Sequence, residues 1–264
     1  MPENNSQYDV IVIGAGVAGL YQLYKLRQLK LKVLVIEAGD NVGDTWYWNR
    51  YPGARFDSES WSYGYSFSRE LFEEWDWPEH FAAQPDTLRY LNYVADKFDL
   101  RRDINFNRRV KAALFNEKTN FWTVRTDTNE SFEARFLITA MGPLSAFTLP
   151  NIEGRETFEG PAYHTARWPH EKVDFSGKRV GIIGTGACAI QTIQTIAKDV
   201  AHLTVFQRSP NWAAPLNNSA ITEAEQKQIK QNFEKIFEQC KKTVACFIPV
   251  SYTHLRAHET DSYL

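Results

Sequence analysis

The chain has 264 residues, of which 43% are hydrophobic and 23% charged, and its formal net charge is −2. This composition is typical of a globular protein, and it excludes the strongly basic balance of many nucleic-acid-binding proteins. No run of about 18 apolar residues predicts a membrane span, and the polar N-terminus does not resemble a signal peptide. Cys188, Cys240 and Cys246 form neither a CxxC pair nor a metal-ligand spacing. We therefore expect a cytoplasmic protein without a metal site.

The first predicted elements form a βαβ unit. The run Val10–Ile13 is short, apolar and β-branched, which is typical of a buried parallel strand. It leads into the pattern GxGxxG at residues 14–19, after which leucines recur at helical spacing over residues 20–29. A second β-branched run, residues 32–36, ends at Glu37. Strand, turn, helix, strand and acid in this order predict a dinucleotide site.

Each glycine of this turn has an expected task. Gly14 permits the tight turn, Gly16 lets the backbone approach a pyrophosphate, and Gly19 lets helix and strand pack closely. The helix N-terminus faces the phosphates, and Glu37 can accept hydrogen bonds from the hydroxyls of an unphosphorylated ribose. FAD or NAD is therefore expected here. The alternative is a glycine turn that serves packing only.

Aromatic residues crowd the next stretch, residues 42–67, together with Arg50, Arg55 and Asp57. Pro52-Gly53 marks a turn within it. One interpretation is an aromatic core layer with a loop, since these rings must be buried somewhere. The other is a polar site walled by rings.

Two strands, residues 121–126 and 131–137, are expected to form a small antiparallel excursion, and residues 136–140 to form a return strand. The segment FEGPAYHTARWP, residues 158–169, then shows no helical or strand period. It lies directly before the second glycine turn and is expected to be a linker.

The second glycine turn repeats the first with one informative change. The strand RVGIIG at residues 179–184 leads into GxGxxA at residues 184–189, and isoleucines continue a helix. The next strand, residues 203–206, is followed by Arg208 where the first unit has its glutamate. A guanidinium pairs with a 2′-phosphate through a contact worth about 1.5–3 kcal/mol, so NADPH is expected at this site. The alternative for Arg208 is an exposed, solvated charge.

Two such sites predict a flavoprotein in which NADPH reduces FAD. A disulfide reductase needs a redox cysteine pair near the flavin, and the sequence has no cysteine before Cys188. A monooxygenase needs none, because its reduced flavin reacts with O2. The cysteine pattern therefore favours a monooxygenase.

The stretch TWYWNRYPGARFDSES, residues 45–60, closely resembles the flavin loop of type I Baeyer–Villiger monooxygenases. The pattern FxGxxxHxxxWP at residues 158–169 resembles the diagnostic fingerprint of that family, whereas related N-hydroxylating and flavin-containing monooxygenases usually lack the Trp-Pro ending. The resemblance covers residues 8 to about 248. It implies insertion of one oxygen atom from O2 beside a ketone carbonyl, with NADPH and FAD, through a C4a-peroxyflavin, giving an ester or lactone.

The resemblance also implies residue roles. Asp57 matches the aspartate that holds a peroxide-stabilising arginine, and Arg55 lies in the part of the loop near the nicotinamide. His164 is expected to link domain position to cofactor state, although a structural histidine on an ordinary linker is the alternative. Cofactor-binding residues are expected at Gly14, Gly16, Ala18, Gly19, Glu37, Thr45, Trp46, Tyr47, Trp48, Asp57, Tyr63, Val110, Met141, Gly142, Thr185, Gly186, Ala187, Cys188, Ala189, Ile190, Gln191, Arg208 and Ser209.

Four further residues carry expectations. Asp44 stands where the family most often has glycine, and its charge is expected to weaken flavin binding unless it points outward. Phe56 replaces a frequent cysteine without an expected effect. In the linker, Gly160 is expected to allow a bend and Trp168 to anchor by burial.

The C-terminal part begins with the capping-box signature Thr222–Glu225, followed by an amphipathic helix that resembles the family's helical insertion. Residues 250–264 match nothing in the family and are expected to be a non-native tail. The match is expected to be an N-terminal half that lacks the peroxide-stabilising arginine. We therefore expect little or no oxygenation from this polypeptide alone.

The expected fold class is α/β, with two Rossmann-like dinucleotide-binding domains that are incomplete at the C-terminus. The FAD domain is expected at residues 1–150, the linker at 151–175 and the NADP domain at 176–249. The expected partners are a ketone and O2, without nucleic acid or membrane. A related flavin N- or S-oxygenase and a non-catalytic FAD/NADP-binding fragment are the alternatives.

Overall fold

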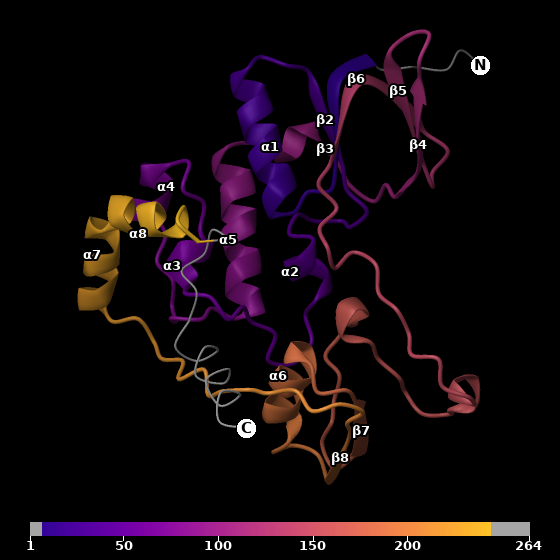
Figure 1. Cartoon of the computed structure of the whole chain (residues 1–264), viewed down its shortest axis with the longest axis vertical. Coiled ribbons are helices and arrows are strands. Elements are labelled where there is room, and N and C mark those ends of the chain that lie inside the picture. The colour runs from indigo at the N-terminus through magenta and orange to yellow at the C-terminus, as the bar shows by residue number, and fades with distance from the viewer. Residues whose placement is uncertain (1–6, 244–264) are drawn as a thin grey trace, which may run out of the picture. The chain divides into compact units, whose positions relative to one another are not determined.

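The computed structural model describes residues 7–243, whose helices and strands are labelled in Figure 1. The chain divides into two compact units. Unit 1 holds the residues up to Asn49 together with Leu88–Trp168. Unit 2 holds Arg50–Thr87 together with the residues from Pro169 onward. The expected tail, residues 250–264, lies outside the described residues, as does Cys246. The domain boundaries expected from the sequence stay a prediction.

Unit 1 is built on a six-stranded sheet with the strand order β3-β2-β1-β6-β5-β4. β1 pairs in parallel with β2 and β6, and β2 pairs in parallel with β3. β5 lies antiparallel between β4 and β6. The strands are β1 (Gln7–Ile13), β2 (Val33–Ile36), β3 (Ile104–Asn105), β4 (Val110–Asn116), β5 (Phe121–Thr126) and β6 (Ser131–Thr139). The parallel α/β character expected from the sequence is confirmed.

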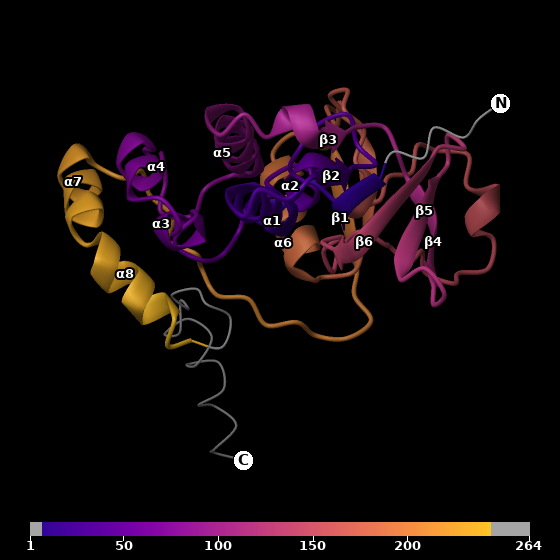
Figure 2. The same cartoon turned by 90° about the horizontal axis from the view of Figure 1, so that it is seen from above.

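The antiparallel excursion expected from the sequence is confirmed as β5 paired with β6, and its second strand and the expected return strand are one continuous element, β6. Its first half pairs with β5, where Arg125 faces Ser131, and it pairs with β1 as far as Thr139 opposite Ile13. Figure 2 shows β4 and β5 as a ribbon beside this strand. A single strand of nine residues can serve both pairings because its two edges bond to different neighbours.

The helices of unit 1 are α1 (Val17–Gln28), α2 (Thr45–Trp48) and most of α5 (Gln84–Lys97), with short 3₁₀ turns η1 (Arg101–Asp103), η2 (Arg155–Thr157) and η3 (Thr165–Arg167). The leucine repeat suggested that α1 reaches Leu29, which is wrong. Leu29 follows the last helical residue and is 69% exposed. Lys30 has a positive φ of 59°, which ends the helical path.

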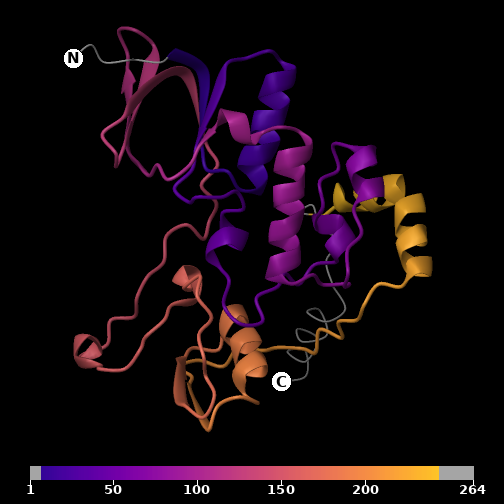
Figure 3. The ribbon, with the colours of Figure 1, turned by 180° about the vertical axis from the view of Figure 1, so that it is seen from behind.

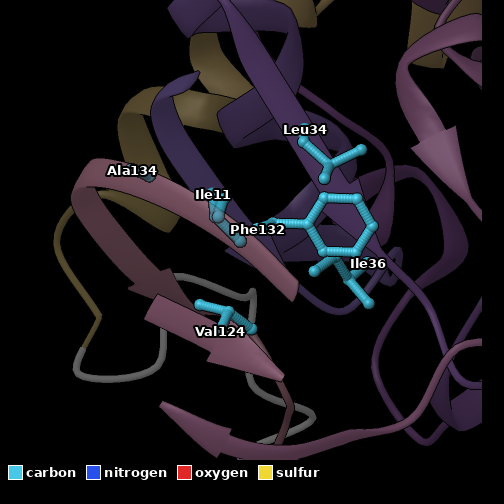
Figure 4. Close-up of a cluster of buried hydrophobic side chains, with 6 residues drawn as sticks. All are labelled: Ile11, Leu34, Ile36, Val124, Phe132 and Ala134. Carbon is cyan, nitrogen blue, oxygen red and sulfur yellow. The ribbon is translucent and has the colours of Figure 1, made fainter. Parts of the chain in front are cut away.

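One core cluster holds the parallel strands to the antiparallel ribbon. Figure 4 shows the ring of Phe132 beside Leu34 and Ile36, with Ile11 and Val124 close by. All are buried, and burial of each such side chain contributes about 1.5–3 kcal/mol. This core fixes β1 and β2 near their C-terminal ends, where the first glycine turn and Glu37 begin.

Unit 2 contains a parallel pair of strands, β7 (Arg179–Ile183) and β8 (His202–Phe206), joined through α6 (Ala187–Ile196). Its other helices are α3 (Ser60–Tyr63), α4 (Arg69–Glu74), α7 (Glu223–Gln231) and α8 (Phe233–Cys240). Phe72 of α4 packs edge-to-face on Phe237 of α8, and Figure 3 shows these two helices close together.

The capping box at the start of α7 is confirmed, because Thr222 and Glu225 exchange both hydrogen bonds. The single amphipathic helix expected after it is wrong: it is two helices divided at Asn232. The side-chain amide of Asn232 donates to the carbonyl oxygen of Gln228 at 2.7 Å, a local bond that competes with helix continuation. No helix among residues 7–243 is long and apolar enough to cross a membrane.

Candidate functional site

The first glycine turn joins β1 to α1 in a backbone path that only glycine fits. Gly14 has a φ of +102°, and a Cβ there would lie 2.6 Å from the carbonyl oxygen of Ala140. A Cβ at Gly19 would lie 1.9 Å from the carbonyl oxygen of Gly14, closer than any real contact. Gly16 caps the N-terminus of α1 without a side chain. The turn therefore offers the close backbone approach that a pyrophosphate needs.

Glu37, at the end of β2, ties this turn together. Its side chain is 4% exposed, and its two oxygens accept hydrogen bonds from the backbone N–H groups of Ala15 and Gly39, each at 2.7 Å. The acid expected at a ribose thus also supports the turn. Each carboxylate oxygen still has a second lone pair, so Glu37 can also accept a hydroxyl.

Asp44 projects into the turn rather than outward. A Cβ at Gly16 would lie 2.7 Å from the Cβ of Asp44, and a Cβ at Gly142 would lie 2.5 Å from its Oδ2. Burial raises the pKa of Asp44 to about 6, with a further rise from the charge of Glu37, against the opposing effects of the Thr45 N–H and Arg167. Asp44 also has a positive φ of 42° with a ψ of −103°, outside the left-handed helical region that residues with a side chain most often adopt at positive φ.

Arg167, the residue before Trp168, is a functional candidate that the sequence reasoning missed. Its guanidinium lies 5.0 Å from the ring centre of Trp48 and 5.1 Å from that of Phe147, and it donates to the carbonyl oxygen of Ser145 at 2.7 Å. Burial lowers its pKa, as does the charge of Arg109. A cation inside the fingerprint was the signal that could have pointed to it.

The linker residues have local structural contacts. The Nδ1 atom of His164 accepts a hydrogen bond from the N–H of Ala166 at 3.1 Å, and burial lowers the pKa of the imidazole. Gly160 does not have a positive φ, so a left-handed bend is not its reason for being glycine. A Cβ there would lie 2.6 Å from the ring of Phe158. Trp168, expected to be buried, is half-buried and packs on Tyr163 with ring centres 5.4 Å apart.

In unit 2, the loop that resembles the flavin loop is held by polar contacts. The guanidinium of Arg55 donates to Glu79 and to the carbonyl oxygen of Phe81, each at 3.1 Å. Asn218 donates to the same carboxylate oxygen of Glu79 at 2.8 Å. Asp57 is exposed. The positive charge of Arg55 is thus balanced by Glu79, which follows the loop in the sequence.

Gln191 of α6 connects the same loop to the helix of the second turn. Its Oε1 accepts from the hydroxyl of Tyr51 at 2.8 Å, and its Nε2 donates to the carbonyl oxygen of Arg55 at 3.0 Å. Burial raises the pKa of Tyr51, and its contact with Cys188 adds to the rise. Tyr63 stacks on Phe56, with ring centres 4.4 Å apart. Phe56 is therefore part of an aromatic layer.

The second glycine turn repeats the conformation of the first at its first two glycines. Gly184 has a φ of +100°, and Gly186 caps α6 without a side chain. No heavy atom within 4 Å would meet a Cβ at either glycine. Gln207 donates to the hydroxyl of Thr185 at 3.1 Å, and Asn211 to the carbonyl oxygen of Thr185 at 2.8 Å. Sequence reasoning missed these two amides, although both flank Arg208, which is exposed.

The expected site residues fall into two groups, one in each unit. Unit 1 contains Gly14, Gly16, Ala18, Gly19, Glu37, Thr45, Trp46, Tyr47, Trp48, Val110, Met141, Gly142 and His164. Unit 2 contains Arg55, Asp57, Tyr63, residues 185–191, Arg208 and Ser209. Within residues 7–243, no cluster of three or more His, Cys, Asp or Glu side chains could hold a metal ion.

Residues 11–260 match the family described as pyridine nucleotide-disulphide oxidoreductase. The chain belongs to this family. The matched region contains both glycine turns. It contains no cysteine before Cys188, and therefore no redox cysteine pair near the first turn.

Similar proteins support the narrower resemblance. A Baeyer–Villiger monooxygenase of Pseudooceanicola batsensis is 44% identical over 92% of this chain. Phenazine N-monooxygenase PhzNO1 of Lysobacter antibioticus is also 44% identical over 92% of the chain. The crystal structure of OTEMO in complex with FAD and NADP is 48% identical and superposes with a TM-score of 0.87 over 91% of the chain. The resemblance to Baeyer–Villiger monooxygenases is confirmed.

The chain spans about half the length of these proteins. It covers 44% of the Pseudooceanicola enzyme, 45% of the Lysobacter enzyme and 46% of the OTEMO chain.

Proposed function

We propose that the chain binds FAD at the first glycine turn and NADP(H) at the second, as the nucleotide-binding half of a Baeyer–Villiger monooxygenase. The observation that carries this proposal is the pairing of two like turns with unlike charges. Gly14 and Gly184 adopt φ values of +102° and +100°, yet the strands that follow lead to Glu37 and Arg208. The same backbone cradle is thus combined with opposite ribose preferences.

The charges decide which dinucleotide each turn prefers. Glu37 would repel a 2′-phosphate, so the first turn suits a dinucleotide whose ribose has free hydroxyls. Arg208 would pair with a 2′-phosphate, and its exposure leaves the guanidinium accessible to a ligand. FAD, when bound, supplies the redox chemistry; the residues of this chain hold and orient the two nucleotides.

Binding is tested on the purified chain by titration with FAD and with NADPH or NADH. We expect quenching of flavin fluorescence on binding, and a preference for NADPH over NADH. Glu37→Ala should weaken FAD binding, and Arg208→Ala should leave FAD binding intact while removing the preference for NADPH. If FAD and NADPH both failed to bind a folded chain, the proposal would be wrong.

We further propose that the activity of the complete enzyme is insertion of an oxygen atom from O2 beside a ketone carbonyl. The resemblance over residues 8 to about 248, including the fingerprint at residues 158–169, supports this class. The cytoplasm stays the proposed compartment because of the cysteine spacing. The polypeptide of 264 residues alone should give little ester, because it corresponds to 44–46% of the similar proteins. The test is incubation with NADPH, ¹⁸O₂ and a ketone, with mass analysis of the products.

N-oxygenation is a second candidate because of one observation. The phenazine N-monooxygenase is as similar to this chain as the Baeyer–Villiger enzyme is. Fusing residues 7–243 to the remaining half of each of these proteins would separate the two classes. We expect the product to follow the added half, so ketone and phenazine assays on both fusions would show whether this chain itself selects the substrate.

A further inference from the structure

We propose that Asp44 competes with the dinucleotide pyrophosphate at the first glycine turn, and that the protein takes up one proton at Asp44 when the dinucleotide binds. This inference rests on the proposed binding of FAD at that turn. It concerns a residue that stands where the Baeyer–Villiger pattern most often has glycine, and the proposed role of Asp44 is in ligand affinity and not in catalysis.

The geometry places the Asp44 side chain beside the two glycines that line the turn. Its Cβ lies 2.7 Å from the position of a Cβ at Gly16, and its Oδ2 lies 2.5 Å from the position of a Cβ at Gly142. Gly16 caps α1, a helix of 12 residues, whose positive N-terminal end attracts an anion. In this structure the carboxylate of Asp44 lies beside that end, while the carboxylate of Glu37 accepts from the N–H of Ala15, one residue before Gly16.

Burial is the largest cause of the raised pKa of Asp44, and the neighbouring groups act on this pKa in both directions. Glu37, at the end of β2, opposes ionisation, whereas Arg167 of η3 and the backbone N–H of Thr45 favour it. Arg109, ahead of β4, acts on Arg167 and not directly on Asp44. A pyrophosphate at the turn would add further negative charge. It would raise the pKa of Asp44 above its value of about 6 in the empty protein.

The pH dependence of FAD binding follows from these two pKa values of Asp44, the lower one in the empty protein and the higher one in the complex. Below about pH 6 Asp44 is protonated with or without a ligand, so affinity for FAD should not change with pH. Above that pH the carboxyl must take up a proton as the ligand binds, and affinity should fall by up to about tenfold per pH unit. The affinity stops falling at the pH that equals the pKa of Asp44 in the complex.

The main test compares the dissociation constants of FAD for the wild type and for Asp44→Asn, from about pH 5 to about pH 8.5. Quenching of flavin fluorescence gives the constants, and calorimetry in buffers of different ionisation enthalpy counts the protons taken up. We expect a rising dissociation constant and proton uptake in the wild type, and a flat profile with no uptake in the variant. Asp40→Asn removes an exposed charge nearby and should keep the wild-type profile.

Arg167 provides an independent test. Arg167→Gln removes the cation that favours ionised Asp44, so the fall in affinity should begin at a higher pH than in the wild type. Arg167→Lys keeps the charge and should keep the onset. A merely structural role of Arg167 would weaken FAD binding equally at all pH values without moving the onset.

Two results separate this inference from the proposed function. If the wild type binds FAD with the same pH profile as Asp44→Asn, the inference is wrong and the FAD site stands. Asp44→Gly, which suits the positive φ of 42°, is a second variant should Asp44→Asn fail to fold. If the folded wild type and both Asp44 variants fail to bind FAD at any pH, the proposed FAD site is wrong and this inference fails with it.

Discussion

The two glycine turns share a backbone path and differ in what surrounds it. In the first turn, Gly19 and Gly14 are in contact with neighbouring backbone, Glu37 accepts two backbone hydrogen bonds, and Asp44 lies at the helix N-terminus. In the second turn, Gly184 has open space where a Cβ would project. A glycine pattern therefore specifies the turn, while the contacts around it, both local ones and those with distant residues, decide whether the turn is crowded or open.

The difference also shows two uses of the residue at the end of the second strand. Glu37 is buried and supports its turn structurally, so its role in ligand binding and its role in folding are combined. Arg208 is exposed, and its proposed role concerns the ligand alone. A substitution of Glu37 should therefore change the free energy of unfolding as well as ligand affinity, whereas a substitution of Arg208 should change ligand affinity alone.

The largest effect is expected at the third glycine. A Cβ at Gly19 would lie 1.9 Å from the carbonyl oxygen of Gly14, so Gly19→Ala must shift the backbone of α1 or β1. We expect a loss of at least about 3 kcal/mol in the free energy of unfolding. The matched position in the second turn is already Ala189, and Ala189→Gly should cost no more than about 1 kcal/mol. Urea unfolding followed by circular dichroism measures both; equal losses would contradict the contrast.

The next effect concerns the buried acid. Glu37→Ala leaves the N–H groups of Ala15 and Gly39 without their carboxylate and should lower the free energy of unfolding by about 2–3 kcal/mol. Glu37→Gln keeps one acceptor oxygen but brings an amide NH₂ toward the other donor, so a smaller loss is expected. Chemical unfolding of the empty protein measures these losses without any ligand. An unchanged Glu37→Ala protein would show that the two hydrogen bonds add nothing to stability.

The exposed cation of the second turn should affect binding and not folding. Arg208→Ala should leave the free energy of unfolding within about 0.5 kcal/mol of the wild type. Loss of one charge-assisted contact of about 2 kcal/mol would reduce the preference for NADPH over NADH about thirtyfold. Titration with each nucleotide gives the ratio, and Arg208→Lys, which keeps a positive charge without the planar fork, should retain part of it. An unchanged ratio would mean that another group recognises the 2′-phosphate.

The sequence was sufficient for the βαβ units, because strand, glycine turn and helix each leave a local pattern. It was sufficient for the capping box at Thr222 for the same reason. It could not show that Asp44 points inward, since that direction depends on Gly142, nearly a hundred residues away. Arg167 was missed because its partners, Trp48 and Phe147, come together only through folding. Periodicity continued across Asn232, where a local side-chain bond divides the helix.

The smallest expected effect is a dependence of the free energy of unfolding on pH, which Asp44 causes in the crowded first turn. The pKa of Asp44 is raised from 3.8 to about 6, so the folded state holds its proton more tightly than the unfolded state. Ionised Asp44 therefore destabilises the folded state. This loss in the free energy of unfolding is absent below about pH 4, grows between about pH 4 and pH 6, and is complete above that range. The carboxyl is partly solvated, so we expect only about 1–2 kcal/mol for the full effect.

Asp44→Asn removes this titration while keeping the size and shape of the side chain. The free energy of unfolding of Asp44→Asn should therefore equal that of the wild type at about pH 4 and exceed it by about 1–2 kcal/mol at about pH 7. Asp40→Asn, at an exposed position, should follow the wild type at both pH values. Urea unfolding of the ligand-free proteins tests this, and parallel curves for wild type and Asp44→Asn would show that the empty turn does not oppose the charge. Because no dinucleotide is present, this measurement isolates the strain in the turn itself from any competition with a ligand.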